Sequence, residues 1–233
     1  MTELHWLEAH EAAELIATKK LTSLELTKAL LDRIERYDQG LNAFLTLRPD
    51  QALKDANRAD EAVNKNEPIG PLHGVPFALK DIIDAAEWPT TAHSQLLADN
   101  IAQNDAEVTA RLKKAGGILL GKLSTHEFAL GGPSFDLPWP PARNAWGREY
   151  FPGGSSSGSG AAVAAGFVPI ALGSDTGGSV RNPASMNGLL GMKATYGRVS
   201  RRGVVPLSFS LDHVGPLTRS VKDNALALSV ISG

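Results

Sequence analysis

The sequence contains no cysteine, and this absence excludes several kinds of chemistry at once. Without a thiol among its 233 residues, the chain has no disulfide, no thiolate metal site and no cysteine nucleophile. It also carries little net charge, because 23 Lys and Arg residues nearly balance 25 Asp and Glu residues. No strong field therefore draws it to nucleic acid or to an anionic membrane surface, and we expect neither as a partner.

Long hydrophobic runs are absent as well. The longest apolar run, residues 161–173, is interrupted by Gly166 and Pro169 and is too short to cross a bilayer. The first residues, MTELHWLEAHE, are acidic and lack the apolar core of a signal peptide. We therefore expect a cytoplasmic protein without a membrane segment, whose 42% hydrophobic residues suffice to bury a sizeable core.

Two polar, glycine-rich stretches lie within residues 151–187, FPGGSSSGSGAAVAAGFVPIALGSDTGGSVRNPASMN. The apolar segment from Ala161 to Leu172 joins them, so we expect both loops to be attached to a buried element. Glycine permits positive φ, and the run Thr176-Gly177-Gly178-Ser179 can direct consecutive backbone N–H groups at one point. Because such groups bind a developing oxyanion, the pattern favours a catalytic site.

Helix signals dominate the first third of the chain. Thr22-Ser23-Leu24-Glu25 matches a capping box, and apolar residues then recur at helical spacing up to Gly40, which predicts a helix with one buried stripe. Further helices are predicted around residues 8–19 and 51–64, with a short strand at 43–47 between them. The predicted stripe consists of Leu26, Leu30, Ile34 and Tyr37.

The next segment predicts strands and a buried lysine. The apolar strand 75–79 delivers Lys80 at its end, next to Asp81. Such a lysine either extends to water or pairs with Asp81, or else it is desolvated, has a lowered pKa and acts as a base. We expect residues 104–107 to cap a helix that ends at Gly116. A strand at 118–120 follows, and this order indicates α/β layering with partly parallel strands.

Residues 121–141 form a loop-rich stretch of the kind that is usually functional or a lid. His126 and Glu127 lie in it, but adjacent residues lack the ligand spacing of a zinc site, so no metal is expected.

Several interpretations compete for the glycine-rich stretches. Too few Gly and Pro residues are present for a linker, and no buried strand precedes residue 154 as a dinucleotide loop requires. The same missing strand counts against residues 154–158 as a G-x-S-x-G hydrolase elbow around Ser156, although Asp175 or Asp212 and then His213 follow in a suitable order. Ser179 follows a predicted strand, 168–172, and suits a nucleophile better. Its base must come from elsewhere in the fold, with Lys80 and the serines of the first loop as candidates.

Five segments together closely resemble the amidase signature family of serine amidohydrolases, from about residue 8 to the last residue. The resemblance implies a mixed β-sheet core covered by helices on both faces, and a Ser-Ser-Lys triad without cofactor or metal. In that triad Ser179 is the nucleophile, Ser155 the bridging serine after a cis peptide bond, and Lys80 the base. The resemblance also implies that the backbone of Thr176, Gly177, Gly178 and Ser179 supplies the oxyanion hole and that the loop around Ala129 lines the acyl side of the pocket. The segments are GVPFALKDIID, GKLSTHEFA, PGGSSSGSGAAVAAG, LGSDTGGSVRNPAS and GMKATYGRVSRRG.

Two departures from the family pattern stand out. Ser157 occupies a position where the family usually has glycine, and the chain is shorter than family members normally are. We therefore expect residues 1–233 to be one amidase signature domain that lacks the C-terminal part of the fold. Such a chain is a fragment, or it is completed by another polypeptide or a second copy of itself.

The resemblance implies an amidase that hydrolyses a small linear amide through an acyl-enzyme. The segment GGPSFDLPWPP, residues 131–141, favours this interpretation over the first alternative, the A subunit of a tRNA-dependent amidotransferase for glutamyl-tRNA(Gln) or aspartyl-tRNA(Asn), acting as a glutaminase. The second alternative is an inactive truncated chain with a binding role.

Overall fold

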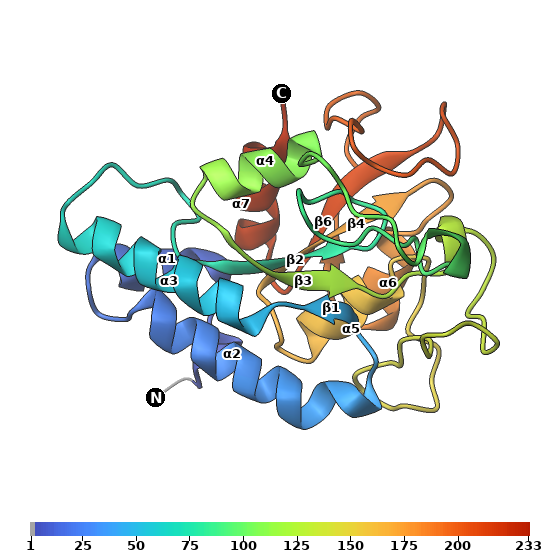
Figure 1. The fold of residues 1–233 in the computed structure, drawn as a ribbon, viewed down its shortest axis with the longest axis horizontal. Coiled ribbons are helices and arrows are strands. Elements are labelled where there is room, and N and C mark those ends of the chain that lie inside the picture. The colour runs from blue at the N-terminus through green and yellow to red at the C-terminus, as the bar shows by residue number, and fades with distance from the viewer. Residues whose placement is uncertain (1–2) are drawn as a thin grey trace.

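A six-stranded mixed sheet forms the centre of the protein (Figure 1). The computed structural model describes residues 3–233. The strand order is β1-β3-β2-β4-β6-β5, in which β2 runs parallel to β3 and β4 while the remaining pairs are antiparallel. This arrangement confirms the predicted α/β fold with partly parallel strands. The strands are β1 Phe44–Leu47, β2 Pro76–Lys80, β3 Ile118–Leu123, β4 Ile170–Asp175, β5 Leu190–Gly191 and β6 His213–Thr218.

Helices cover the sheet on both sides, with α4 and α7 above the strands in Figure 1 and α5 below them. Within residues 3–233, no helix is both long and apolar enough to cross a membrane. The helices are α1 Ala9–Ala17, α2 Ser23–Tyr37, α3 Pro49–Asn64, α4 Glu107–Lys114, α5 Ser157–Ala164, α6 Arg181–Met186 and α7 Val221–Ile231.

Helix α2 begins at the predicted capping box. The Thr22 hydroxyl accepts from the Glu25 N–H at 3.0 Å, and the Glu25 carboxylate accepts from the Thr22 N–H at 2.9 Å. Leu26, Leu30 and Ile34 are buried as predicted. The prediction was wrong for Tyr37, which is 49% exposed because the last turn of the helix extends beyond the core.

Helix α4 begins differently from the prediction. Its N-cap residue is Ala106, which has no side-chain oxygen to offer. The Asp105 carboxylate accepts instead from the Ala86 N–H at 2.8 Å and pairs with Lys113 at 2.8 Å. The helix was therefore predicted correctly, but the capping was not.

Two strands extend further than the sequence indicated. β3 continues to Leu123, so that Gly121 lies in the sheet and not in a loop. β4 continues to Asp175, and the predicted loop therefore begins three residues later than Gly173. The apolar segment 161–172 divides between α5 and β4, which confirms that both glycine-rich loops are attached to buried elements.

The pairing of β2 with β3 contains an irregularity that sets the direction of two side chains. Phe77 lies opposite Leu119, but Ala78 lies opposite Gly121, so Leu120 is an extra residue in β3. Beyond it, Leu79 pairs with Lys122 and Lys80 pairs with Leu123. Because directly paired residues share a face of the sheet, Lys80 and Lys122 point to opposite faces.

Candidate active site

Lys80 is the last residue of β2, and its side chain is fully buried. Its Nζ donates to the Ser155 Oγ at 2.6 Å and to the Ser174 Oγ at 2.8 Å. Ser174 lies on β4, the strand next to β2, and Ser155 lies just before α5. The parallel pairing of β2 with β4 thus brings the two loop regions to the end of the lysine strand.

The neighbouring carboxylate of Asp81 does not contact the Lys80 ammonium. It lies 3.0 Å from the Nζ of Lys122 and accepts from the N–H and hydroxyl of Thr91 at 2.9 and 2.5 Å. The interpretation that Lys80 pairs with Asp81 or extends to water is therefore wrong, because burial directs the side chain toward the two serines instead.

Burial lowers the pKa of Lys80 to about 7, although the more distant carboxylates of Asp212 and Asp175 work in the opposite direction. A large fraction of this lysine is therefore neutral at neutral pH. A neutral amine at hydrogen-bond distance from a serine hydroxyl is able to take its proton.

The first glycine-rich loop delivers Ser155 and is fixed on two sides. The Gly154–Ser155 peptide bond is cis. On one side, the Ser155 carbonyl accepts from the His126 N–H at 3.0 Å. On the other, the Gly154 N–H donates to the Asn182 side chain at 3.0 Å. A side chain at Gly154 would collide with the His126 ring, so only glycine fits here.

The second loop carries Ser179, which is half-buried. Its carbonyl accepts from the Ser156 N–H at 3.4 Å, so the two loops touch through their backbones. Within residues 3–233 the Ser179 hydroxyl makes no hydrogen bond. The structure thus brings Ser155 and Lys80 into direct contact and places Ser179 on the adjoining loop.

Asp175 organises the turn that contains the expected oxyanion hole. Its carboxylate accepts from the Gly178 N–H at 2.9 Å and from the Arg181 guanidinium in two bonds of 3.0 Å. Burial works to raise the pKa of Asp175, but the Arg181 hydrogen bonds outweigh it and the pKa lies below its ordinary value. Because the Gly178 N–H is already engaged, the N–H groups of Thr176, Gly177 and Ser179 are the remaining candidates.

Ala129 ends a 3₁₀ turn, Glu127–Ala129, against the first loop. Its N–H donates to the His126 carbonyl at 2.8 Å, and His126 in turn contacts Ser155. Both Phe128 and Ala129 have positive φ, 48° and 62°, which is uncommon for residues other than glycine. Ala129 thus lies beside the first glycine-rich loop, and its role on the acyl side of the pocket stays a prediction.

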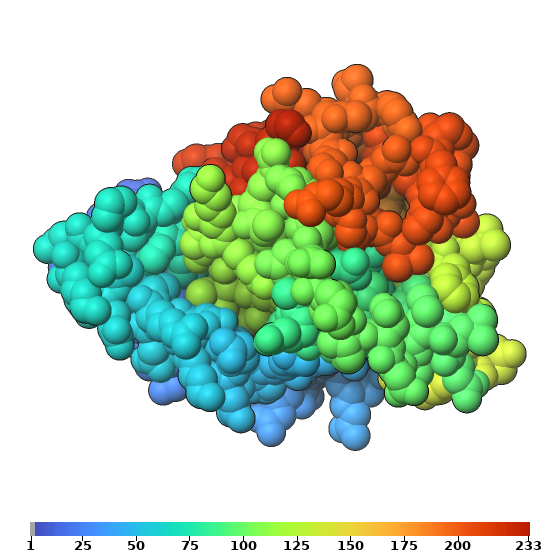
Figure 2. Space-filling view, turned by 45° about the horizontal axis from the view of Figure 1, so that its top comes forward, coloured from blue at the N-terminus to red at the C-terminus, as the bar shows by residue number. Residues whose placement is uncertain are grey.

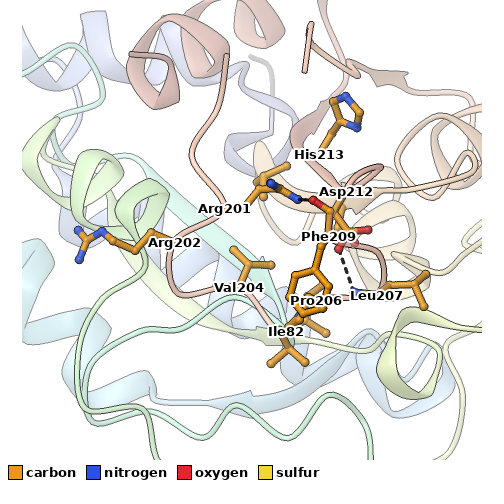
Figure 3. Close-up of a pocket in the computed structure, with 12 residues that line it drawn as sticks. Ile82, Arg201, Arg202, Val204, Pro206, Leu207, Phe209, Asp212 and His213 are labelled. Atoms are coloured by element: carbon orange, nitrogen blue, oxygen red, sulfur yellow. Dashed lines mark hydrogen bonds between the residues drawn. The ribbon is translucent and has the colours of Figure 1, made fainter. Parts of the chain in front are cut away.

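A cavity of about 450 Å³ lies between residues 201–214 and Ile82 (Figure 3). Ser174, which accepts from Lys80, lies in its wall. The Asp212 carboxylate lies at the edge and accepts from the Leu207 N–H at 2.8 Å, as drawn in Figure 3. The segment 193–212, which supplies much of the wall, forms the orange lobe of Figure 2. The apolar part of the lining comprises Ile82, Val204, Val205, Pro206, Leu207, Phe209 and Val214.

The hydrolase-elbow interpretation of Ser156 does not fit the structure. The Ser156 hydroxyl is buried and donates to the Ser174 carbonyl at 3.3 Å. The His213 ring bonds to the carbonyls of Leu211 and Asp175, at 2.6 and 3.2 Å. No histidine in the described part of the chain is hydrogen-bonded to Ser156, and no strand precedes this loop.

Sequence reasoning missed Ser174, the second partner of Lys80. The run Gly173-Ser174-Asp175 is predicted as a loop, whereas it is the end of β4. The apolar strand before Ser174 was the available signal. If that strand runs parallel to β2, a serine one or two residues beyond its apolar part lies beside the last residue of β2.

The structure is thus an α/β protein in which Lys80 at the end of β2 meets Ser174 at the end of β4 and Ser155 just before α5. Residues 25–233 match the family described as Amidase. The solved peptide amidase from Stenotrophomonas maltophilia is 39% identical, with a TM-score of 0.92 over 98% of this chain and 48% of that one. A bacterial aryl acylamidase is 32% identical, with a TM-score of 0.92 over 100% of this chain and 49% of that one. The chain belongs to the amidase signature family.

Among curated relatives, the A subunit of the glutamyl-tRNA(Gln) amidotransferase from Moorella thermoacetica is 50% identical over 99% of this chain and 47% of its own length. The corresponding A subunit from Chloroflexus aurantiacus is 46% identical over 100% of this chain and 48% of its own length. The chain therefore spans about half the length of the curated relatives it matches.

Proposed function

We propose that the protein hydrolyses a carboxylic amide through an acyl-enzyme on Ser179, with Ser155 and Lys80 as the proton relay. The observation that carries the proposal is the contact of 2.6 Å between the Lys80 Nζ and the Ser155 Oγ, made by a fully buried lysine whose pKa is lowered to about 7. This is the arrangement that a serine nucleophile requires when no histidine is available as a base.

The proposed reaction begins when neutral Lys80 accepts the Ser155 proton and Ser155 accepts that of Ser179. The Ser179 oxygen then bonds to the amide carbon, and the carbonyl oxygen becomes an oxyanion held by N–H groups among those of Thr176, Gly177 and Ser179. As the C–N bond breaks, the relay returns the proton to the departing nitrogen. A water molecule next attacks the ester, again losing its proton to the relay, and the carboxylic acid leaves from a restored Ser179.

For the substrate we propose the side-chain amide of glutamine, with ammonia as the product that leaves. The support is the 46–50% identity to amidotransferase A subunits, which exceeds the 32% and 39% identity to the aryl acylamidase and the peptide amidase. This reverses the order expected from the sequence, where the segment 131–141 favoured a small-molecule amidase. A partner protein that uses the ammonia is part of this proposal.

A small linear amide is the second candidate substrate. The observation in its favour is the close superposition on the peptide amidase and the aryl acylamidase, with TM-scores of 0.92 for both. The two candidates separate in one assay, because a glutaminase releases ammonia from glutamine, whereas an amidase of the second kind releases the amine from peptide or aryl amides. Turnover of neither would favour a binding role.

The proposal is tested by labelling with a fluorophosphonate and locating the adduct by mass spectrometry. We expect one adduct, on Ser179, that is lost in Ser179→Ala. Ser185→Ala serves as the matched control, because Ser185 is an exposed serine on α6, the helix that follows Ser179. An adduct on Ser156, or full amide hydrolysis by Ser179→Ala, would contradict the proposal.

A further inference from the structure

Two buried histidines hold the two ends of the segment 131–139, which follows the 3₁₀ turn at Ala129. The Nδ1 of His126 bonds to the Gly131 carbonyl at 2.9 Å, and the Nε2 of His93 bonds to the Trp139 carbonyl at 3.0 Å. The two side chains are 4% and 1% exposed. The segment extends on the side of the sheet where β2 and β3 end (Figure 1). Each end of this surface loop is thus attached to the interior by one imidazole.

The hydrogen bonds determine which nitrogen of each ring carries the proton. A carbonyl only accepts, so His126 carries its proton on Nδ1 and His93 carries its proton on Nε2. The other nitrogen of His93 accepts from the Thr125 N–H at 3.4 Å. The Nε2 of His126 is buried and has no partner within residues 3–233. A second proton on the His126 ring would meet no acceptor, so that ring is neutral in this arrangement, whereas the Nδ1 of His93 also has the Ser124 hydroxyl at 3.2 Å.

His126 also contacts the catalytic loop. Its N–H donates to the Ser155 carbonyl at 3.0 Å, and its ring occupies the space beside Gly154. Phe151, just before that loop, packs on the ring with a centroid distance of 6.2 Å. His126 thus joins the loop that carries Ser155 to the start of the segment 131–139.

The backbone around these histidines is held in an unusual conformation. Ala92, His93, Phe128 and Ala129 all have positive φ, between 48° and 62°. The Phe128 N–H donates to the Ala92 carbonyl at 3.0 Å and joins the two stretches. Non-glycine residues keep such values only where the surrounding structure enforces them, and they are frequent in ligand clamps and active sites.

We propose that His93 and His126 are positioning residues that fasten the two ends of the segment 131–139 to the interior and, through His126, to the loop that carries Ser155, so that they hold Ser155 beside Lys80. The proposal rests on the proposed function for its catalytic consequence but not for the attachment itself. Burial lowers the pKa of His126, although the Gly131 hydrogen bond works in the opposite direction, and this favours the neutral ring at neutral pH.

Hydrogen exchange of the amides that flank the segment 131–139 tests the attachment, because the Leu130 N–H donates to the Glu127 carbonyl at 3.0 Å and the Arg143 N–H donates to the Leu41 carbonyl at 2.7 Å. In His126→Ala and His93→Ala, each of which loses a buried hydrogen bond, we expect the Leu130 and Arg143 amides to exchange about tenfold faster. His126→Asn and His93→Gln retain a donor near the Nδ1 and Nε2 positions and should restore most of the protection. His73→Ala is the matched control, because His73 bonds to the Ala59 carbonyl at 2.9 Å before the opposite end of β2. Unchanged exchange in both alanine variants would overturn the proposal.

Two further readouts address the catalytic consequence. Nitrogen NMR of the imidazoles should show opposite tautomers, with the proton on Nδ1 in His126 and on Nε2 in His93; the same tautomer in both would overturn the assignment. Fluorophosphonate labelling of Ser179 should slow about tenfold in His126→Ala and recover in His126→Asn. If His126→Ala showed faster amide exchange but an unchanged rate of Ser179 labelling, His126 would not position the loop that carries Ser155. If the unaltered protein shows no Ser179 adduct, the proposed function fails, while the exchange comparison still decides the attachment.

Discussion

Two lysines on neighbouring strands are fully buried, yet their surroundings differ. Lys80 on β2 contacts two serine hydroxyls. Lys122 on β3 lies 3.0 Å from the Asp81 carboxylate and also donates to the Pro89 carbonyl and the Thr90 hydroxyl, at 2.8 and 2.9 Å. Burial lowers the pKa of both, but for Lys122 the adjacent Asp81 opposes it at contact distance, whereas for Lys80 the opposing carboxylates are not in contact.

The difference shows that burial alone does not make a lysine a base. A lysine in contact with a carboxylate is retained as an ammonium and holds parts of the structure together, here β3 and the segment that follows β2. A lysine that contacts only hydroxyls is free to give up its proton and to exchange it with them. Four experiments test whether Lys80 serves as a base while Lys122 serves only to stabilise the fold.

The largest effect is expected from Lys80→Met. Because methionine fills the space but cannot accept a proton, labelling of Ser179 by a fluorophosphonate should slow about 10³-fold. The free energy of unfolding should not fall, because a costly buried amine has been removed. Labelling rates from mass spectrometry and a urea titration measure the two quantities. A labelling rate within tenfold of the unaltered protein would show that Lys80 is not the base.

Lys122→Met should show the opposite pattern. It leaves the Asp81 carboxylate buried without its partner, so the free energy of unfolding should fall by about 3–5 kcal/mol. The double variant Lys122→Met/Asp81→Asn should recover part of this loss, because the neutral amide oxygen still accepts from Thr91. Urea titrations provide the measurement. If Lys122→Met and Lys80→Met changed stability equally, the proposed difference between the two lysines would be wrong.

The pH dependence of labelling distinguishes the lysines in the unaltered protein. Lys80 acts as a base only when neutral, so the rate should be constant above pH about 7 and fall about tenfold for each unit below it. Lys122 contacts neither Ser155 nor Ser174, so its titration should not enter the labelling rate. The rate is measured from about pH 5 to about pH 9, with the same concentration of probe at every pH. A rate that rises toward low pH would exclude a lysine base.

The smallest effect is expected from Ser174→Ala, which removes one of the two oxygens that Lys80 contacts. A hydrogen bond to the hydroxyl stabilises the ammonium more than the neutral amine, so its loss should lower the pKa of Lys80 further. The midpoint of the plot of labelling rate against pH should then move to lower pH by roughly one unit. A midpoint that moves to higher pH would mean that Ser174 does not support the charged form.

Much of the fold follows from local sequence patterns. The Thr22–Glu25 capping box begins α2, apolar runs mark β2 to β4, and the glycine-rich loops lie at the ends of buried elements. These features depend on residues close together in the chain, and so does the position of Lys80 at the end of a strand. The amidase signature motifs added the expected roles of Ser179 and Ser155, which the residues alone left open.

The rest depends on contacts between distant residues. The partner of Asp81 is Lys122 on the next strand of the sheet, although the adjacent Lys80 was the obvious candidate. The pairing of His126 with Gly131 and of His93 with Trp139 requires the path of a loop that has no periodic pattern. Tyr37 follows the helical period and is nevertheless exposed, because the period does not tell where the core ends.

The extra residue Leu120 in β3 explains how both lysines fit within one small sheet. With an uninterrupted register from the pair Phe77 and Leu119, Lys80 would lie opposite Lys122, on the same face. Strands lie about 4.8 Å apart, so two like charges would meet in the interior, and either one amine would lose its proton or the strands would separate. The irregularity at Leu120 thus keeps the amine that contacts two serines and the amine that pairs with Asp81 on opposite faces of the sheet.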